Sequence, residues 1–316
     1  MDERLILSVV VPIYNEAGNI PELVSRLTVE LESLCVAEGE KSDRYELLLV
    51  DDGSADDSWG IIERLHMRDP RVKGLRFARN FGHHFAITAG LDFANGDAVV
   101  LMDGDLQDPP EEIHRLYTKY KEGYDVVYAI RRNRQDHLAK KLLSNAFWKI
   151  INKLSKIDMP INQAMLRILR RDVVDVLNGM RESARFMHGM IAWVGFRVAQ
   201  LEINHGSRMH GESKYNLIHQ IRLAWHAITA FSVLPLRLAM YLGFSAAFIS
   251  FLVGVYYIYL KFAHGFPVSG WASIMVTVFF MGGVQLFMLG TFGEYLGKLY
   301  RQSQQRPLYI VMNKLL

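Results

Sequence analysis

The sequence predicts an α/β domain with a mostly parallel, doubly wound sheet, followed by a C-terminal pair of membrane-spanning helices. Two observations support this prediction. Within residues 1–130, short apolar runs alternate with segments of helical spacing, which is typical of a sheet covered by helices on both faces. Beyond residue 237, two stretches without a charged residue are each long enough to cross a hydrocarbon core of about 30 Å.

The first domain, residues 1–215, divides into strands and helices in a regular order. The expected strands are 5–11, 46–50, 73–77 and 98–102, and the expected helices are 20–34, 58–67 and 85–93. Polar residues follow each of these strands, and ligands of doubly wound sheets bind at the carboxyl ends of the strands. We therefore expect functional residues in four segments: Tyr14-Asn15-Glu16, Asp51-Asp52-Gly53-Ser54, Arg79-Asn80 and Asp103-Gly104-Asp105.

The two uncharged stretches predict membrane spans at 236–261 and 270–294, joined by a short turn. The turn carries only Lys261 and His264, whereas five Lys or Arg residues flank the outer ends of the pair. The positive-inside rule therefore places both outer ends, including the tail 298–316, in the cytosol. Within this tail, residues 307–311 are expected to be either a short strand or part of the tail without regular structure. The first apolar run ends at Pro12 and is therefore a strand rather than a signal peptide. We expect a multi-pass protein of the cell (inner) membrane with a cytosolic N-terminal domain.

Two basic amphipathic helices are predicted beside the membrane, at 138–156 and 216–234. Helices of this kind can lie on an anionic membrane surface, and an ordinary surface helix is the alternative for the first of them. The second runs directly into the first span, which favours a membrane-surface position for both.

Composition excludes several classes of function. The formal net charge is +3, which indicates no nucleic-acid partner, and the one cysteine, Cys35, excludes a disulfide framework or a thiolate metal cluster. No Gly-x-Gly-x-x-Gly follows the first strand and no Gly-x-x-x-x-Gly-Lys-Ser/Thr occurs, which excludes the usual dinucleotide and P-loop sites.

Asp103 and Asp105 predict a metal site. Two carboxylates two residues apart at a strand end point the same way. Mg²⁺ and Mn²⁺ prefer oxygen ligands and bind through one or two carboxylates together with substrate phosphates. The alternative is a simple turn or helix cap. Asp108, before Pro109-Pro110-Glu111, is predicted to cap the next helix.

Five motifs, in this order and followed by two membrane helices, together resemble one enzyme family. They resemble the family 2 glycosyltransferases of GT-A fold, and among these the polyprenyl-phosphate glycosyltransferases, which include bactoprenol glucosyltransferases, the aminoarabinose transferase and dolichyl-phosphate mannose synthase. The motifs are Val11-Pro12-Ile13-Tyr14-Asn15-Glu16, Val50-Asp51-Asp52-Gly53-Ser54, Arg79-Asn80-Phe81-Gly82, Asp103-Gly104-Asp105-Leu106-Gln107-Asp108-Pro109 and Gly211-Glu212-Ser213-Lys214-Tyr215.

The resemblance implies a role for each motif residue. Asp105 would coordinate the metal directly, while Asp103 would reach the nucleotide ribose or the metal and Gln107 would add an oxygen. Asp51 would cap its loop. The remaining implied contacts are to the nucleotide sugar for Pro12, Tyr14, Glu16 and Asp52, to phosphate for Arg131, and to the lipid phosphate or the leaving diphosphate for Arg208, Ser213 and Lys214. For the loop residues the alternative is a plain turn, and for the basic residues it is a solvated charge.

One segment departs from the family pattern. Relatives carry Asp-Phe-Arg-Leu or Asp-Tyr-Gly-Cys-Met-Leu-Arg, whose Asp is a proposed catalytic base, whereas residues 161–167 here contain no carboxylate. A phosphate monoester with a second pKa of about 6 is largely a dianion at neutral pH and has no proton to lose. We therefore expect no general base to be required.

The resemblance implies an inverting glycosyltransferase, dependent on Mg²⁺ or Mn²⁺, that moves a sugar from a nucleotide sugar to polyprenyl (undecaprenyl) phosphate at the cytosolic membrane face. UDP-glucose is the preferred donor, and UDP-aminoarabinose, UDP-GlcNAc and GDP-mannose are alternatives. A homo-oligomer is expected from the family. A non-catalytic, membrane-tethered nucleotide-sugar binding protein is the alternative of a different class. A processive polysaccharide synthase fits less well, because Gln-x-x-Arg-Trp is absent and only two spans are predicted.

Overall fold

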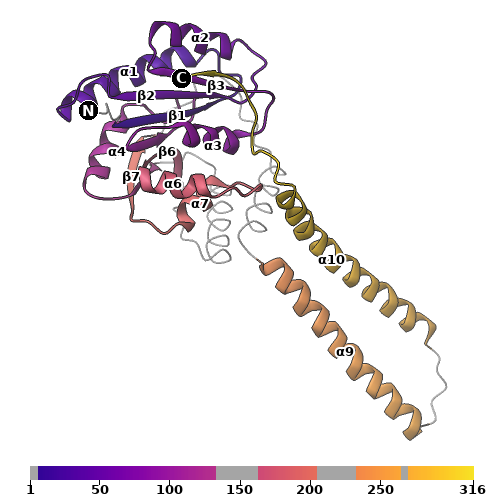
Figure 1. Cartoon of the computed structure of the whole chain (residues 1–316). Helices are drawn as coiled ribbons and strands as arrows, with labels where there is room; N and C mark the ends of the chain where they lie inside the picture. Colours follow the sequence, from indigo (N-terminus) through magenta and orange to yellow (C-terminus); the bar gives the residue numbers. More distant parts are fainter. Residues whose placement is uncertain (1–5, 133–162, 205–232, 265–269) are drawn as a thin grey trace. The chain divides into compact units, whose positions relative to one another are not determined.

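The computed structural model describes residues 6–132, 163–204, 233–264 and 270–316 (Figure 1). Contacts divide the chain into two compact units, residues 1–220 with 307–316, and residues 221–306. The predicted helix at 138–156 and nearly all of the one at 216–234 lie outside the described residues.

The described part of the first unit contains an eight-stranded mixed sheet and six helices. The strands are β1 Leu7–Ile13, β2 Tyr45–Asp51, β3 Val72–Phe77, β4 Ala98–Leu101, β5 Val126–Arg132, β6 Gln163–Arg170, β7 Val198–Asn204 and β8 Val311–Leu315. The helices are α1 Ile20–Ala37, α2 Ser58–Arg68, α3 His83–Phe93, α4 Glu112–Lys121, α6 Arg171–Gly179 and α7 Met187–Trp193.

The strands lie in the order β7-β5-β6-β4-β1-β2-β3-β8. The central strands β4, β1, β2 and β3 are parallel, β6 is antiparallel to both β4 and β5, and β8 is antiparallel to β3. Because β6 lies between β4 and β5 and is antiparallel to both, β4 and β5 run in the same direction. Their carboxyl ends therefore lie at the same edge of the sheet. The predicted mostly parallel α/β sheet is confirmed.

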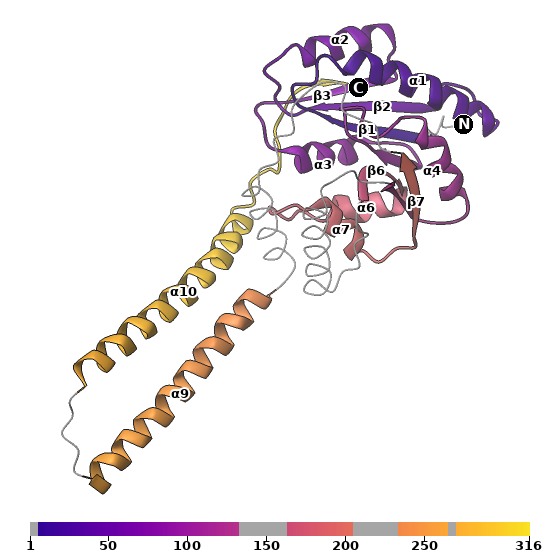
Figure 2. The ribbon, with the colours of Figure 1, turned by 180° about the vertical axis from the view of Figure 1, so that it is seen from behind.

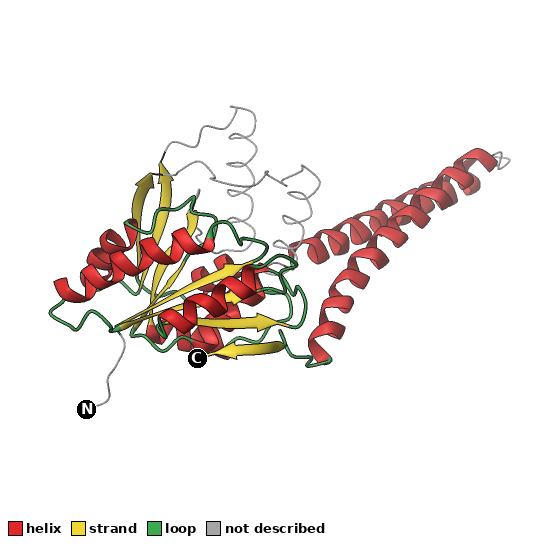
Figure 3. Cartoon of the chain, turned by 90° about the horizontal axis from the view of Figure 1, so that it is seen from above, coloured by secondary structure: helices red, strands yellow, loops and turns green. Residues whose placement is uncertain are grey.

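Burial explains why the central strands form. Every residue of β1, β2 and β4 is buried, and most residues of each strand are apolar, chiefly Val and Leu. The helix α1 contacts α2 and α4 on one face, while α3 and α6 pack together on the other (Figure 1). Seen from above, helices flank the strands of the sheet (Figure 3). In α1 the buried residues recur at helical spacing, which places one apolar face on the sheet: Ile20, Leu23, Val24, Leu27, Leu31 and Leu34.

The C-terminal segment differs from a simple tail. The last helix continues to Ser303, and the strand β8 begins at Val311, where the expected strand of 307–311 ends. β8 pairs with β3, so the last residues of the chain complete the sheet of the first unit.

The second unit contains the helices α9, Leu234–His264, and α10, Trp271–Ser303, which pack against each other (Figure 2). By length and composition, both are long and apolar enough to cross a membrane. Their large apolar side chains are mostly exposed, for example Phe244 at 74% and Phe279 at 75%. A buried helix pair of a soluble core would cover such side chains, so α9 and α10 are candidate membrane spans.

Candidate active site

Hydrogen bonds join the two loops that follow β1 and β2. Ser54 Oγ accepts a bond from the Asn15 amide at 2.9 Å, and Asn15 Oδ1 accepts one from the Ala55 amide at 2.8 Å. The Asp51 carboxylate accepts the Ser54 amide at 2.9 Å, which confirms its predicted role as a loop cap. Tyr14 lies beside this network and is 47% exposed, so its ring is available to a ligand.

Pro12 and Glu16 flank Tyr14 in different environments. Pro12 is buried within β1, whereas Glu16 opens the turn before α1. The Glu16 amide donates to Ser58 Oγ at 3.1 Å, and its carboxylate accepts a bond from Asn19 Nδ2 at 2.5 Å. These bonds account for the shape of the loop, and the implied nucleotide contacts of Pro12, Tyr14 and Glu16 stay predictions.

Asp52 connects the β2 end to the β3–α3 loop. Its buried carboxylate accepts the Phe81 amide at 2.7 Å and the Gly82 amide at 2.9 Å. Burial raises the pKa of Asp52, and the two amides oppose that rise only in part. Gly53 has φ +69, and a Cβ there would stand 2.5 Å from the carbonyl carbon of Arg79, so the two loops can meet only at a glycine. Recognition of a nucleotide base by Asp52 stays a prediction.

Asp103 and Asp105 follow β4 in a tight turn. A Cβ on Gly104 would stand 2.9 Å from Ile13 Cδ1, which shows how closely this turn approaches β1. Asp105 Oδ1 accepts the Gln107 amide at 3.2 Å, and Asp103 Oδ1 lies 2.9 Å from His83 Nε2 at the start of α3. The predicted carboxylates therefore lie at the carboxyl edge of the sheet, beside the β3–α3 loop.

The contact between Asp103 and His83 is a hydrogen bond that becomes an ion pair when His83 is protonated. Burial alone would raise the pKa of Asp103, but the hydrogen bond from His83 and the positive charges of His83, Arg131 and Arg167 lower it. Burial opposes protonation of His83, and the bond to Asp103 nevertheless raises its pKa. Both side chains are partly exposed, so the pair is accessible to a ligand.

Arg131 lies at the carboxyl end of β5, close to Asp108. Its Nη2 is 3.3 Å from Asp108 Oδ2, and the Asp108 side chain is 1% exposed. The prediction that Asp108 caps a helix is wrong, because α4 begins at Glu112 with Glu111 as its N-cap. Asp108 is instead a buried carboxylate that orients the arginine predicted to bind phosphate.

Arg167 is a buried cation that sequence reasoning missed. It lies on β6 opposite Leu101 of β4, and its side chain is fully buried. Nε donates to the Met165 carbonyl at 3.0 Å, Nη2 donates to the Ala164 carbonyl at 2.8 Å, and the guanidinium lies over the Tyr128 ring at 5.2 Å. Burial lowers the pKa of Arg167 to about 10 against the opposing effect of Tyr128 and two carboxylates. An arginine inside an apolar strand is the signal that could have revealed it.

Two further histidines lie near His83. The His84 ring is 5.7 Å from that of His83 and 6.4 Å from that of His188, which comes from α7. Burial lowers the pKa of His84 to about 4, and burial also lowers that of His188 well below its ordinary value. Both imidazoles are therefore neutral at physiological pH. Neither carries a motif signal in the sequence.

The predicted metal ligands fit a hard divalent cation. Asp103 and Asp105 offer carboxylate oxygens on one turn and Gln107 an amide oxygen, and such donors suit Mg²⁺ and Mn²⁺. Within the described ranges, no group of three or more His, Cys, Asp or Glu side chains is arranged to hold a metal. A two-carboxylate site matches a cation that takes its remaining ligands from substrate phosphates and water.

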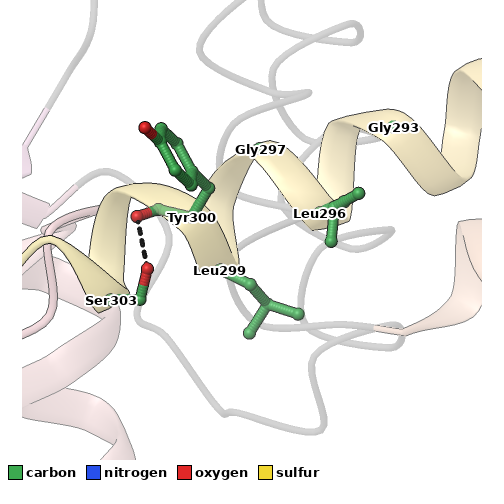
Figure 4. A pocket seen from close by; sticks show the side chains of 6 residues that line it. All are labelled: Gly293, Leu296, Gly297, Leu299, Tyr300 and Ser303. Atoms are coloured by element: carbon green, nitrogen blue, oxygen red, sulfur yellow. Dashed lines mark hydrogen bonds between the residues drawn. The ribbon is translucent and has the colours of Figure 1, made fainter.

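The predicted acceptor residues Arg208, Ser213 and Lys214 lie outside the described residues. A groove in the second unit, on α10, offers no comparable chemistry (Figure 4). The Ser303 hydroxyl donates to the Tyr300 carbonyl of the same helix at 2.9 Å, so the polar group there is satisfied. The groove is lined by Gly293, Leu296, Gly297, Leu299, Tyr300 and Ser303.

The fold and the clustered groups define an α/β enzyme domain with carboxylates and cations gathered at the carboxyl ends of its parallel strands. The model of the family "Glycosyl transferase family 2" matches residues 8–177, which is more than half of the chain. The chain belongs to this family, and it is a glycosyltransferase of GT-A fold.

Named relatives match nearly the whole chain. A bactoprenol glucosyl transferase of Shigella phage SfV is 39% identical and covers 98% of both chains. An undecaprenyl-phosphate 4-deoxy-4-formamido-L-arabinose transferase of Aeromonas hydrophila is 37% identical over 97% of this chain and 93% of the relative. Among solved structures, a mannosyltransferase from Pyrobaculum calidifontis, in complex with GDP-Man and Mn²⁺, is 17% identical with a TM-score of 0.49, covering 93% of this chain and 87% of that chain.

Proposed function

We propose that this chain is an inverting, metal-dependent glycosyltransferase that moves glucose from UDP-glucose to polyprenyl phosphate at the cytosolic face of the inner membrane. The observation that carries the proposal is the extent of the match to the two named relatives. It covers 98% and 97% of this chain, so it includes the two candidate membrane spans as well as the sheet domain. One relative is named for bactoprenol and the other for undecaprenyl phosphate.

The donor would bind along the carboxyl edge of the sheet. Tyr14, Pro12 and Glu16 shape the first loop for the nucleotide, and Asp52 reads the base. Asp103 and Arg131 would face the ribose and the diphosphate, respectively. An arginine fork matches phosphate oxygens in charge and geometry, and Asp108 holds the Arg131 fork in place.

Asp103, Asp105 and Gln107 would hold Mg²⁺ or Mn²⁺. When bound, such a cation supplies Lewis-acid stabilisation of the departing diphosphate. Arg131 adds positive charge on the same edge of the sheet, where fixed charges act more strongly than they would in water.

In the proposed reaction, an oxygen of the polyprenyl phosphate attacks the anomeric carbon of the sugar. A new carbon–oxygen bond forms as the bond from that carbon to the diphosphate breaks, and the nucleoside diphosphate leaves with the electron pair. The attacking dianion has no proton to release, which agrees with the absence of a carboxylate from residues 161–167. Arg208, Ser213 and Lys214 would hold the acceptor phosphate.

The membrane placement completes the proposal. α9 and α10 would anchor a multi-pass protein, and the segments 138–156 and 216–234 would lie at the interface, where the lipid phosphate is found. The chain would act as a homo-oligomer, as expected for the family.

A donor panel tests the proposed function. The full chain, in detergent micelles containing undecaprenyl phosphate and Mn²⁺, is incubated with labelled UDP-glucose, UDP-aminoarabinose, UDP-GlcNAc or GDP-mannose. Transfer of label from UDP-glucose to the lipid is the expected result. Transfer from another donor would change the identity of the proposed sugar and leave the proposed reaction in place. Binding without transfer from any donor would overturn the enzymatic proposal in favour of a nucleotide-sugar binding protein.

A further inference from the structure

The protonation of His188 follows from one hydrogen bond. Arg167 Nη2 lies 2.8 Å from His188 Nδ1. A guanidinium can only donate hydrogen bonds, so Nδ1 must be the acceptor and carry no proton. His188 is then a neutral imidazole with its proton on Nε2. Burial lowers the pKa of His188, and the positive charges of Arg167, His83 and Arg131 lower it further, in agreement with this assignment.

The Nε2–H group of His188 is available for a further bond. Within the described part of the chain, no hydrogen bond to His188 Nε2 is formed, and the side chain is partly exposed. The bonds from Arg167 to two carbonyls of β6 hold the guanidinium in place, and the guanidinium in turn holds the imidazole. A pre-oriented neutral donor of this kind suits a hydroxyl oxygen and adds no charge to the site.

The position of His188 along the sheet indicates which part of a ligand it would meet. Asp52 follows β2, Asp103 follows β4, and Arg167 lies on β6, in the spatial order β2-β1-β4-β6. Asp52 is the proposed base-recognition residue, and Asp103 is a proposed ligand of the cation that would bind the diphosphate. His188, bonded to Arg167, therefore lies on the far side of Asp103 from the base. The group beyond the diphosphate of a nucleotide sugar is the transferred sugar.

We propose that His188 binds a hydroxyl group of the transferred sugar through Nε2–H and that Arg167 is the positioning residue that fixes this tautomer. The inference rests on the proposed glycosyl transfer and deepens it, because it assigns a residue to sugar recognition. It predicts that His188 acts on the hexose and has no part in binding the nucleoside diphosphate.

Two substitutions separate the two nitrogens of the ring. In His188→Asn, the amide oxygen can still accept the bond from Arg167, but the distal donor is lost. In His188→Gln, the amide nitrogen can reach the position of Nε2, but the acceptor for Arg167 is lost. His114→Asn is the matched control, because His114 is exposed on α4. The measurements are UDP binding in the presence of Mn²⁺ and kcat/KM with UDP-glucose and its monodeoxy analogues, one for each hydroxyl.

Loss of one hydrogen bond to a substrate hydroxyl should lower kcat/KM of His188→Asn about ten- to a hundredfold. UDP binding should stay unchanged, His188→Gln should retain more activity than His188→Asn, and the control should behave as the unsubstituted chain. One monodeoxy donor should be impaired with the unsubstituted chain but no further impaired with His188→Asn, because both changes remove the same bond.

The tautomer is tested separately by ¹⁵N NMR of histidine-labelled protein. A protonated Nε2 and an unprotonated Nδ1 are expected for His188, and Arg167→Lys should preserve them because lysine can still donate. An Nδ1–H signal would overturn the assignment of the tautomer.

The sugar contact would be overturned if kcat/KM were equal for His188→Asn and the unsubstituted chain. It would also be overturned if His188→Asn lost equal activity with every deoxy donor and lost UDP binding to the same extent. If the unsubstituted chain transfers no sugar from any donor, the proposed function fails first and this inference fails with it.

Discussion

The two halves of the sheet contribute opposite charges to the same edge. In the half formed by β3, β2, β1 and β4, the groups that follow β2 and β4 are the carboxylates Asp52, Asp103 and Asp105. In the half formed by β6, β5 and β7, the groups on the strands are the cations Arg131 and Arg167. A metal cation requires the first half and a diphosphate requires the second, so a metal–diphosphate ligand would bridge them.

The two halves also differ in how their polar groups are stabilised. Asp51 and Asp52 are buried. Asp51 accepts a bond from a backbone amide of its own loop, and Asp52 accepts bonds from backbone amides of the β3–α3 loop. Arg167 is buried as well, but it donates to backbone carbonyls of its own strand and to an imidazole. In the parallel half, buried carboxylates therefore fix the positions of the loops. In the mixed half, backbone carbonyls of the same strand and neighbouring side chains fix the positions of the cations.

The largest effect is expected for the carboxylate half, with Asp105→Ala. If Asp105 coordinates the cation, transfer should fall about a thousandfold or more, since Lewis-acid stabilisation contributes several kcal/mol. Addition of EDTA should lower the activity of the unsubstituted chain to the same level. The measurement is transfer of labelled sugar to the lipid, with circular dichroism to check folding. The control is Asp57→Ala, whose carboxylate is 65% exposed. Unchanged turnover in Asp105→Ala would remove this residue from the site.

The cationic half is tested by Arg131→Ala and Arg131→Lys. Loss of the guanidinium should lower kcat/KM about a hundredfold in Arg131→Ala. Arg131→Lys should retain part of the activity because the positive charge remains. The Ala variant should also lose about 2–3 kcal/mol of unfolding free energy, because the buried Asp108 loses its cation. Thermal unfolding and steady-state kinetics separate the two effects. Arg115→Ala, on exposed surface, is the control. A stability loss without a kinetic loss would show that Arg131 serves Asp108 only.

A smaller effect, on stability alone, is expected for Glu46 in the parallel half. Its buried carboxylate lies 2.8 Å from Lys73 Nζ and accepts bonds from Ser8 and the Asn95 amide. Glu46→Ala should cost about 2 kcal/mol of unfolding free energy and leave the KM for the donor unchanged.

The same carboxylate predicts a pH dependence of stability. Burial alone would raise the pKa of Glu46, but the bonds from Lys73, Ser8 and Asn95 lower it below 4.5. The contribution of the Glu46 carboxylate to the free energy of unfolding is therefore complete above pH 4.5. This contribution is lost as pH falls through the lower pKa that Glu46 has in the folded state. Melting temperatures measured from neutral to acidic pH should fall less steeply in Glu46→Ala. Parallel curves would contradict the assignment.

The smallest effect is expected at the outer edge of the parallel half, with Tyr309→Phe. The Tyr309 hydroxyl donates to Asp92 at 2.6 Å, and its ring stacks on Phe77 at 5.2 Å. The substitution keeps the stacking and removes one hydrogen bond, so about 1 kcal/mol should be lost. Asp92 keeps its two bonds from Arg181, which limits the effect. Tyr300→Phe, whose ring is exposed on α10, is the control in a thermal unfolding assay.

The parallel half was predictable because its signals are local. Each strand contains a short apolar run, and each functional segment follows its strand directly in sequence, as Asp103 follows β4. The mixed half was not predicted, because its strands are separated by long segments and β6 pairs antiparallel with β4 and β5. The contact of Arg167 with His188 joins two elements that share no motif, so no local pattern could show it. Asp108 was misassigned because a proline pair looks like a helix start, while the pairing with Arg131 is a tertiary contact.

The pairing of β8 with β3 has a consequence for how the protein is made. Residues 1–220 leave the ribosome well before residues 307–316, and both candidate membrane spans are synthesised between them. Until the last strand emerges, the β3 edge carries unpaired amides and carbonyls, which invite pairing with other chains. We expect the sheet to be completed only after the hairpin has been inserted, so a stop codon before residue 307 should yield an aggregation-prone product even though every residue of the candidate site has been translated.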